Sequence, residues 1–271
     1  MDSNMVYGVA LETFFYGHSP TECPSIEQAV RALLDRSLGV EVWPVRGPHD
    51  KDGMTSYQAD QVRDICRNAP FVSMHSRYSL WKWNPTLLMN EIELCSRLGS
   101  DRLVIHRETL GLNRAGDSIL KDEVANIARY AKDRNVLLLM ENTPDGMWAL
   151  DEVLTRLGEK PDDTNMGICI DVGHAHISSD AGKQPIREYF KRYSSQLRHV
   201  HFSDNNGEED SHLPPGKGTI QWKDVFACLA DIGYTKSCVL EIHPNGDTGQ
   251  AIDETVAFLR ASEAGVHFGE A

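Results

Sequence analysis

The stretch 197–218 combines side chains that can bind a metal ion. If residues 197–202 form a strand, His201 lies near its end, on the same face as His199. The acidic loop that follows brings three more potential ligands within reach of that end: Asp204, Asp210 and His212. Imidazole nitrogens and carboxylate oxygens are ligands that Zn²⁺ or Mn²⁺ accepts. A core histidine beside a solvated acidic loop explains this stretch equally well. The rest of the chain is needed to distinguish this explanation from a metal site.

Ionisable side chains also end several other apolar segments. Six of them fall at the carboxyl ends of six different predicted strands, each at a position that points inward: His75, His106, Glu141, Asp171, His201 and Glu241. Burying an inward carboxylate without a partner costs free energy. Six ionisable groups at one mouth are therefore best explained if they share cations or protons. A single histidine at the position of His75 is more often a structural residue of the barrel rim than a metal ligand. Glu141 ends an apolar strand, where a glutamate rarely has a purely structural role.

Neighbouring residues add to this predicted centre. His174, on the turn after Asp171, can face the same point, whereas His176 is expected to cap or to lie in solvent. His199 lies one layer deeper, where a neutral, hydrogen-bonded core role is expected. Aromatic side chains after the first three strands either wall a substrate pocket or pack loops: Phe14, Phe15, Tyr16, Trp43, Trp81 and Trp83.

Short apolar strands alternate with amphipathic helices along the whole chain. The predicted strands are Val6–Leu11, Val40–Trp43, Phe71–His75, Leu103–His106, Val136–Glu141, Met166–Asp171, Leu197–Phe202 and Cys238–Ile242. Helical patterns cover 26–34, 58–68, 88–98, 120–131, 151–157, 185–193, 222–232 and 248–261, and several end just before a glycine.

Eight such units without a linker or a shift in composition predict an α/β fold, a single (β/α)₈ TIM barrel domain over 1–271. The active sites of such barrels lie at the mouth that the strand ends form. A doubly wound open sheet is the alternative. It needs a glycine-rich phosphate-binding turn after an early strand, and the turn after Leu11 has none.

The composition of the chain limits the kinds of partner that the protein is expected to bind. With 27 basic and 40 acidic residues the formal net charge is −13, which disfavours a protein that binds nucleic acid by neutralising phosphates. The six cysteines lack paired metal-site spacing and are expected to be reduced core residues. No signal peptide or apolar run long enough to span a membrane is present, so we expect a cytoplasmic protein; a homo-oligomer is left open.

At these residues the sequence resembles the xylose isomerase-like TIM barrel superfamily, which includes ketose 3-epimerases, inosose dehydratase and endonuclease IV. The resemblance covers nearly the whole chain and is carried by 140–142 (Met-Glu-Asn), 170–174 (Ile-Asp-Val-Gly-His), 200–204, 210–218 and 240–242. It implies a divalent metal ion (Mn²⁺, Zn²⁺, Mg²⁺ or Co²⁺) held by Glu141, Asp171, His201 and Glu241. It also implies that Glu141 and Glu241 are the catalytic acid and base.

The resemblance therefore implies a sugar or sugar-phosphate isomerase or epimerase that acts through a metal-stabilised enediolate. The expected substrate-binding residues are His174, His75, His106, Arg77, Lys217 and Trp43; Tyr78 and Arg107 are further potential phosphate contacts.

Endonuclease IV is the second branch to consider. Its trinuclear zinc ligands correspond to an extended set here, which adds His75, His106, His174, Asp210 and His212 to the four residues above. A phosphodiesterase of that type is thus the alternative, a polyol dehydratase of the inosose dehydratase type is third, and a non-catalytic binding barrel is fourth. The net charge and the scarcity of basic residues near the mouth favour a small sugar over DNA.

Overall fold

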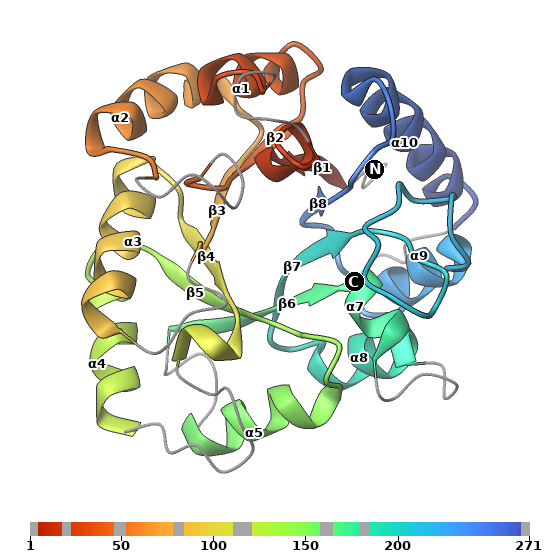
Figure 1. Ribbon diagram of the computed structural model, residues 1–271. Coiled ribbons are helices and arrows are strands. Elements are labelled where there is room, and N and C mark those ends of the chain that lie inside the picture. Colours follow the sequence, from red (N-terminus) through yellow and green to blue (C-terminus); the bar gives the residue numbers. More distant parts are fainter. Residues whose placement is uncertain are drawn as a thin grey trace.

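A computed structural model of the chain describes residues 5–17, 23–45, 53–77, 84–110, 121–157, 165–178 and 185–266. Eight parallel strands close into one barrel in sequence order, β1 next to β8, and helices surround it (Figure 1). This confirms the predicted barrel and excludes the open sheet. The strands are β1 (Val6–Ala10), β2 (Gly39–Val42), β3 (Val72–His75), β4 (Arg102–Ile105), β5 (Leu137–Glu141), β6 (Met166–Asp171), β7 (Leu197–Phe202) and β8 (Ser237–Leu240).

The helices follow the predicted patterns closely. They are η1 (Leu11–Phe14), α1 (Ile26–Leu34), α2 (Ser56–Ile65), η2 (Cys66–Asn68), α3 (Pro85–Arg97), η3 (Arg107–Leu110), α4 (Lys121–Lys132), α5 (Met147–Leu157), α7 (Val172–Ile177), α8 (Pro185–Tyr193), α9 (Trp222–Asp231) and α10 (Thr248–Glu263). Within the described part of the chain, no helix is both long and apolar enough to cross a membrane.

Capping residues set where two helices begin. In α1, Ser25 and Gln28 exchange the hydrogen bonds of a capping box, and Thr55 and Gln58 do the same in α2. Because Thr55 is the cap, α2 begins before the predicted residue 58. Helix α5 likewise begins at Met147 rather than at 151.

The sequence analysis missed the short helix α7. Residues 172–177 were expected to form a turn, but Asp171 accepts a hydrogen bond from the backbone N–H of His174 and caps one and a half turns of helix. His174 is buried in this helix, and its ring is held between the backbone carbonyl of Asn142 and the carboxylate of Asp210.

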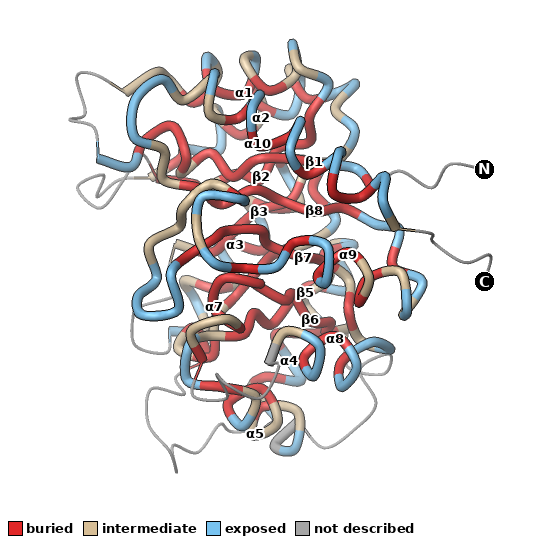
Figure 2. Tube along the Cα trace, turned by 90° about the vertical axis from the view of Figure 1, so that its right-hand side faces the viewer, coloured by how far each residue is buried: buried red, intermediate tan, exposed pale blue. Residues whose placement is uncertain are grey.

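Burial follows the barrel walls (Figure 2). The main apolar core fills the space between strands and helices, whereas a separate small cluster of Val104, Leu139 and Cys169 lies inside the barrel. All six cysteines are free, and all but Cys23 are buried, as predicted. The polar residues described next lie inside the barrel and at its mouth.

Candidate metal centre at the barrel mouth

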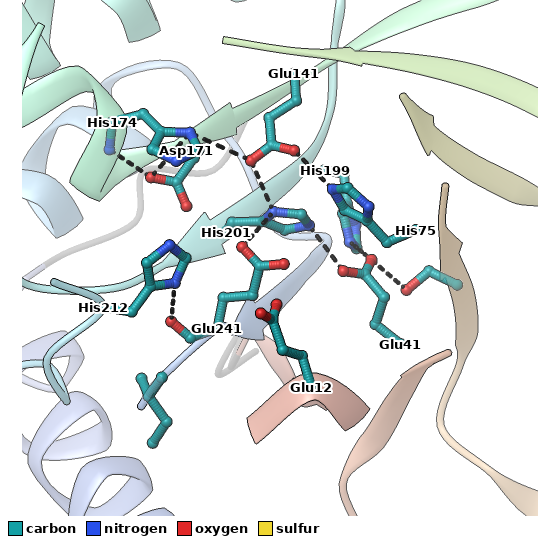
Figure 3. Close-up of polar contacts among 12 residues, drawn as sticks. Glu12, Glu41, His75, Glu141, Asp171, His174, His199, His201, His212 and Glu241 are labelled. Carbon is teal, nitrogen blue, oxygen red and sulfur yellow. Dashed lines mark hydrogen bonds and ion pairs between the residues drawn. The ribbon is translucent and has the colours of Figure 1, made fainter. Parts of the chain in front are cut away.

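Four strands each bring one potential metal ligand to the carboxyl-terminal mouth. Glu141 ends β5, Asp171 ends β6, His201 lies one residue before the end of β7, and Glu241 follows β8 directly. All four side chains are buried, and one ligand atom from each lies within 4.8 Å of the others. Figure 3 shows them pointing toward one another. The structure thus brings together the four residues that the sequence analysis selected.

His201 lies between the two glutamates of this group. Its Nδ1 is 3.2 Å from Oε1 of Glu141 and 3.4 Å from Oε2 of Glu241. In Figure 3 Glu141 approaches this nitrogen from above and Glu241 approaches it from below. Burial by itself would lower the pKa of His201, but the surrounding anionic groups raise it well above its usual value. Anionic groups that hold a proton on a buried imidazole in this way can also hold a cation.

Glu141 joins this group to a second one. Its Oε2 is 3.0 Å from Nε2 of His75 and 2.8 Å from Nε2 of His106. Burial would raise the pKa of Glu141, but His201 and His106 hold it well below its usual value. Burial would also lower the pKa of His75, whereas the hydrogen bond and charge of Glu141 raise it to about 9. Glu141 therefore stays ionised, with both oxygens facing imidazole nitrogens.

A third group lies beside the first. Nε2 of His174 is 3.0 Å from Oδ2 of Asp210, and Nε2 of His212 is 3.3 Å from Oδ1 of the same carboxylate. Burial would lower the pKa of His212, but Asp210 and Glu241 raise it to about 10. His212 has a positive φ of 45°, a conformation that costs a residue other than glycine on the order of 1 kcal/mol. The ring of His212 is held between Asp210 and the backbone carbonyl of Glu241, which lies 3.0 Å from its Nδ1.

The donor set fits a divalent cation. Asp171, Glu141 and Glu241 place three carboxylates in one buried site, and Oδ2 of Asp171 is buried without a hydrogen-bond partner in the described residues. Burial raises the pKa of Asp171 to about 6, and the nearby charges of Glu141 and Glu241 act in the same direction. One imidazole nitrogen with three carboxylates is a set that Zn²⁺, Mn²⁺ or Co²⁺ accepts.

Two of the remaining predicted substrate-binding residues lie near these groups. The Trp43 ring is tilted against His75 with centroids 5.7 Å apart, and its buried Nε1–H has no partner among the described residues. That indole can donate to a bound ligand. Arg77 follows β3 closely, and its backbone N–H donates to the Glu91 carboxylate, whose Oε1 also lies 4.0 Å from its guanidinium.

Lys217 lies elsewhere. It lines a hollow of about 400 Å³ between the loop 213–217, the segment 243–245 and α10. Within the described ranges, no contact joins this ammonium to the three ligand groups. The same hollow is lined by His243, which stacks on His212, so the predicted role of Lys217 in substrate binding stays a prediction.

Other residues considered from the sequence have different roles. Arg107 is buried, 3.6 Å from Glu108 and 3.7 Å from Asp145, with its guanidinium over the Trp148 ring, so its charge is already paired. Phe14 and Phe15 pack in the core, whereas Tyr16 is half exposed and stacks on His243. Tyr78, Trp81 and Trp83 lie outside the described residues.

The sequence analysis overlooked three polar residues near the mouth. Glu41, on β2, is fully buried and lies 3.1 Å from both His199 and His201. Glu12 lies 3.5 Å from His243, which in turn stacks on His212. Glu41 lies between two valines inside its strand, whereas Glu141 was selected because it ends one.

The fold is thus a closed parallel barrel with groups of potential metal ligands at its carboxyl-terminal mouth. Residues 37–262 match the sequence profile of the xylose isomerase-like TIM barrel. The chain belongs to this family.

Relatives in sequence point to two chemistries. An uncharacterised protein of Methanocaldococcus jannaschii is 32% identical over 184 residues, 63% of this chain and 61% of the relative. Fructoselysine 3-epimerase of Escherichia coli O157:H7 is 24% identical over 127 residues, 45% of this chain and 44% of the epimerase. A probable endonuclease 4 of Thermosipho africanus is 27% identical over 194 residues, 63% and 66% of the two chains. The first of these matches thus spans about three fifths of the relative's length.

Solved structures share the fold. The structure of L-ribulose 3-epimerase superimposes with a TM-score of 0.71 at 15% identity and covers 96% of this chain and 95% of the epimerase. A D-tagatose 3-epimerase-like protein gives a TM-score of 0.67 at 21% identity, covering 95% and 99%. At these identities the likeness establishes the barrel, and the activity has to be argued from the site.

Proposed function

We propose that this protein is a divalent-metal-dependent isomerase or epimerase of a sugar or sugar phosphate. The observation that carries the proposal is the placement of Glu141 and Glu241 around one nitrogen of His201, Nδ1, at the barrel mouth, with Asp171 beside them. The epimerases among the relatives and structural neighbours support a sugar substrate.

Glu141, Asp171, His201 and Glu241 would hold the metal ion. A bound divalent ion polarises a substrate carbonyl and acidifies the neighbouring C–H. The protein's own residues then have to move protons. One carboxylate removes the proton from the carbon beside the carbonyl, and the carboxylate on the opposite face returns one to that carbon or its neighbour.

The two glutamates differ in how many ion-pair partners their carboxylates have, and therefore in how readily each can accept a proton. Both oxygens of Glu141 face imidazoles, those of His75 and His106 on one side and His201 on the other. Among the described residues the Glu241 carboxylate has a single ion-pair partner, His201 at 3.4 Å. Glu241 is therefore the better-placed base, and Glu141 combines proton transfer with holding the histidines.

Imidazoles around the mouth supply the substrate contacts. His75, His106 and His174 line the side of Glu141. In the described residues both nitrogens of His75 and His174 contact protein groups, so Nδ1 of His106 is the imidazole nitrogen that can contact a sugar hydroxyl. The Trp43 ring beside His75 closes this wall, and its unpaired Nε1–H is a further donor. This arrangement suits one polar, ring-sized molecule.

Solvent exchange during turnover tests the proposal. In D₂O, conversion of a ketose should place deuterium at the reacting carbon. Glu141→Gln and Glu241→Gln, each saturated with metal, should each slow exchange by about 10² to 10⁴, by unequal amounts because Glu141 has more partners. Exchange that proceeds unchanged in both metal-loaded variants would show that another residue is the base.

A phosphodiesterase of the endonuclease IV type is the second candidate, and a specific observation favours it. The described residues contain three adjacent ligand groups at the mouth, His75–His106–Glu141 and His174–Asp210–His212 on either side of the four-residue group. Such a set can hold more than one ion. Counting bound metal, together with the abasic-DNA assay described below, distinguishes the two candidates.

A further inference from the structure

A glutamate without an assigned role lies beneath the candidate metal centre. Glu41 is on β2, between Val40 and Val42, and its side chain is fully buried inside the barrel. An ionised carboxylate removed from water is costly unless it is paired and hydrogen-bonded. The residues around Glu41 show what offsets this cost.

One oxygen of Glu41 is held by the barrel interior. Oε2 accepts a hydrogen bond of 2.8 Å from the hydroxyl of Ser73 on β3, and it lies 3.1 Å from Nε2 of His199 on β7. Nδ1 of His199 is 3.0 Å from the hydroxyl of Ser237 on β8. His199 therefore bridges the Glu41 carboxylate and the Ser237 hydroxyl. The carboxylate is thereby fixed in one orientation.

The other oxygen faces His201. Oε1 of Glu41 is 3.1 Å from Nε2 of His201 (Figure 3). The two atoms form a close ion-pair contact, and neither has a hydrogen-bond partner in the described part of the chain. The opposite nitrogen of the same ring, Nδ1, faces Glu141 and Glu241 in the ligand group. The two nitrogens of His201 therefore face two different environments.

This division has a chemical consequence. A neutral imidazole has one N–H and one lone pair, and it binds a metal through the lone pair. A hydrogen bond from the other nitrogen to a carboxylate selects the tautomer and fixes the ring. With Glu41 beneath Nε2, the proton belongs on Nε2 and the lone pair on Nδ1 points at the centre.

We propose that Glu41 is a positioning residue that fixes the tautomer and direction of His201 as a metal ligand. The inference rests on the proposed metal centre. Ser73 and His199 act one step further away, because they hold Oε2 and leave Oε1 directed at His201. The carboxylate also supplies a negative charge behind the ligand ring.

Cobalt binding tests this role without an assay of activity. Wild-type protein, Glu41→Gln and Ser73→Ala are stripped of metal and titrated with Co²⁺ against a competing chelator, and visible absorption is recorded. Glu41→Gln keeps the shape of the side chain and should lower Co²⁺ affinity by about 10- to 100-fold and shift the cobalt absorption bands. Ser73→Ala is the matched control: it removes one hydrogen bond to Oε2 and should cause a much smaller change in both readouts.

A measurement on the wild-type protein tests the same inference if Glu41→Gln does not fold. In zinc-loaded protein labelled with ¹⁵N-histidine, nitrogen NMR should show His201 with its proton on Nε2 and the metal on Nδ1. A proton on Nδ1 would overturn the inference, as would unchanged cobalt affinity and absorption in a folded Glu41→Gln. Wild-type protein that binds no Co²⁺ would instead overturn the proposed metal centre itself.

Discussion

Glu91 is a carboxyl group outside the ligand groups whose ionisation the fold opposes. It lies on α3 and is only 3% exposed, where it accepts hydrogen bonds from the Ser76 hydroxyl and the backbone N–H of Arg77. Burial raises the pKa of Glu91 to about 7, and these hydrogen bonds offset only part of that effect. Because Ser76 follows His75, Glu91 anchors the segment that carries one of the predicted ligands.

This shifted pKa predicts a pH dependence of stability. The folded state binds the Glu91 proton more tightly than the unfolded chain does, so the free energy of unfolding falls as pH rises from about 4.5 to about 7. Glu91→Gln mimics the protonated group and should remove this loss. In metal-free protein we expect the variant to match the wild type near pH 4.5 and to exceed its stability at pH 8 by up to roughly 3 kcal/mol.

Denaturant unfolding across this pH range measures the difference. Glu93→Gln, on the same helix, is the control, because hydrogen bonds from Tyr130 and Arg134 lower the pKa of Glu93 instead of raising it. A constant difference between wild type and Glu91→Gln at every pH would contradict the account.

Single residues also show where reasoning from sequence succeeded and where it failed. His75, Glu141 and Asp171 were found because each ends an apolar strand at an inward position. Glu41 escaped because it lies inside a four-residue strand rather than at its end. The surroundings of Arg107 could not be foreseen either, since nothing in the sequence shows that Asp145 and Trp148 lie close to its guanidinium.

At the scale of elements, the loop after β7 is organised by one buried aspartate. Asp204 accepts hydrogen bonds from the backbone N–H groups of Asn205, Gly216 and Ile220 and from Nε1 of Trp222, at 2.9 to 3.1 Å. The sequence analysis expected Asp204 within reach of the mouth as a potential ligand. The structure corrects this expectation, because both oxygens of the Asp204 carboxylate accept hydrogen bonds from the donors just named.

Removing that carboxylate should therefore loosen the loop. Asp204→Ala leaves several buried donors without a partner and should destabilise the protein by about 3 kcal/mol or more. Because the same loop carries Asp210 and His212, ions bound by these two residues should be lost as well. Thermal or denaturant unfolding checks the first effect, and metal analysis checks the second. Glu209→Ala, an exposed change in the same loop, should alter neither; wild-type stability in Asp204→Ala would contradict this role.

Whole elements were easier to predict than their contacts. The eight strands were found to within one or two residues because parallel strands buried on both faces form apolar runs. Helix α7 was missed because its six residues are too few to show a helical stripe. The closure of the barrel determines which loop residues meet at the mouth. The sequence does not directly give the distances between these residues.

For the molecule as a whole, charge separates the two candidate functions. The chain has a net charge of −13, and the loop 204–212 adds acidic side chains next to the mouth. A duplex needs many phosphate contacts to stay bound at physiological salt. We therefore expect negligible incision of a duplex with an abasic site at about 0.15 M salt. Multiple-turnover cleavage that Glu241→Gln abolishes would reverse the ranking in favour of the phosphodiesterase.

The central claim is that the barrel mouth binds a divalent metal ion, and elemental analysis of purified protein tests it most directly. We predict at least about one divalent ion per chain in the wild type, a sharp loss of occupancy in Glu141→Gln and in His201→Ala, and no loss in His176→Ala, since His176 on α7 contacts Thr219 and lies outside the ligand groups. Wild-type protein without metal after saturation and desalting, or equal metal in the wild type and both ligand variants, would contradict the account.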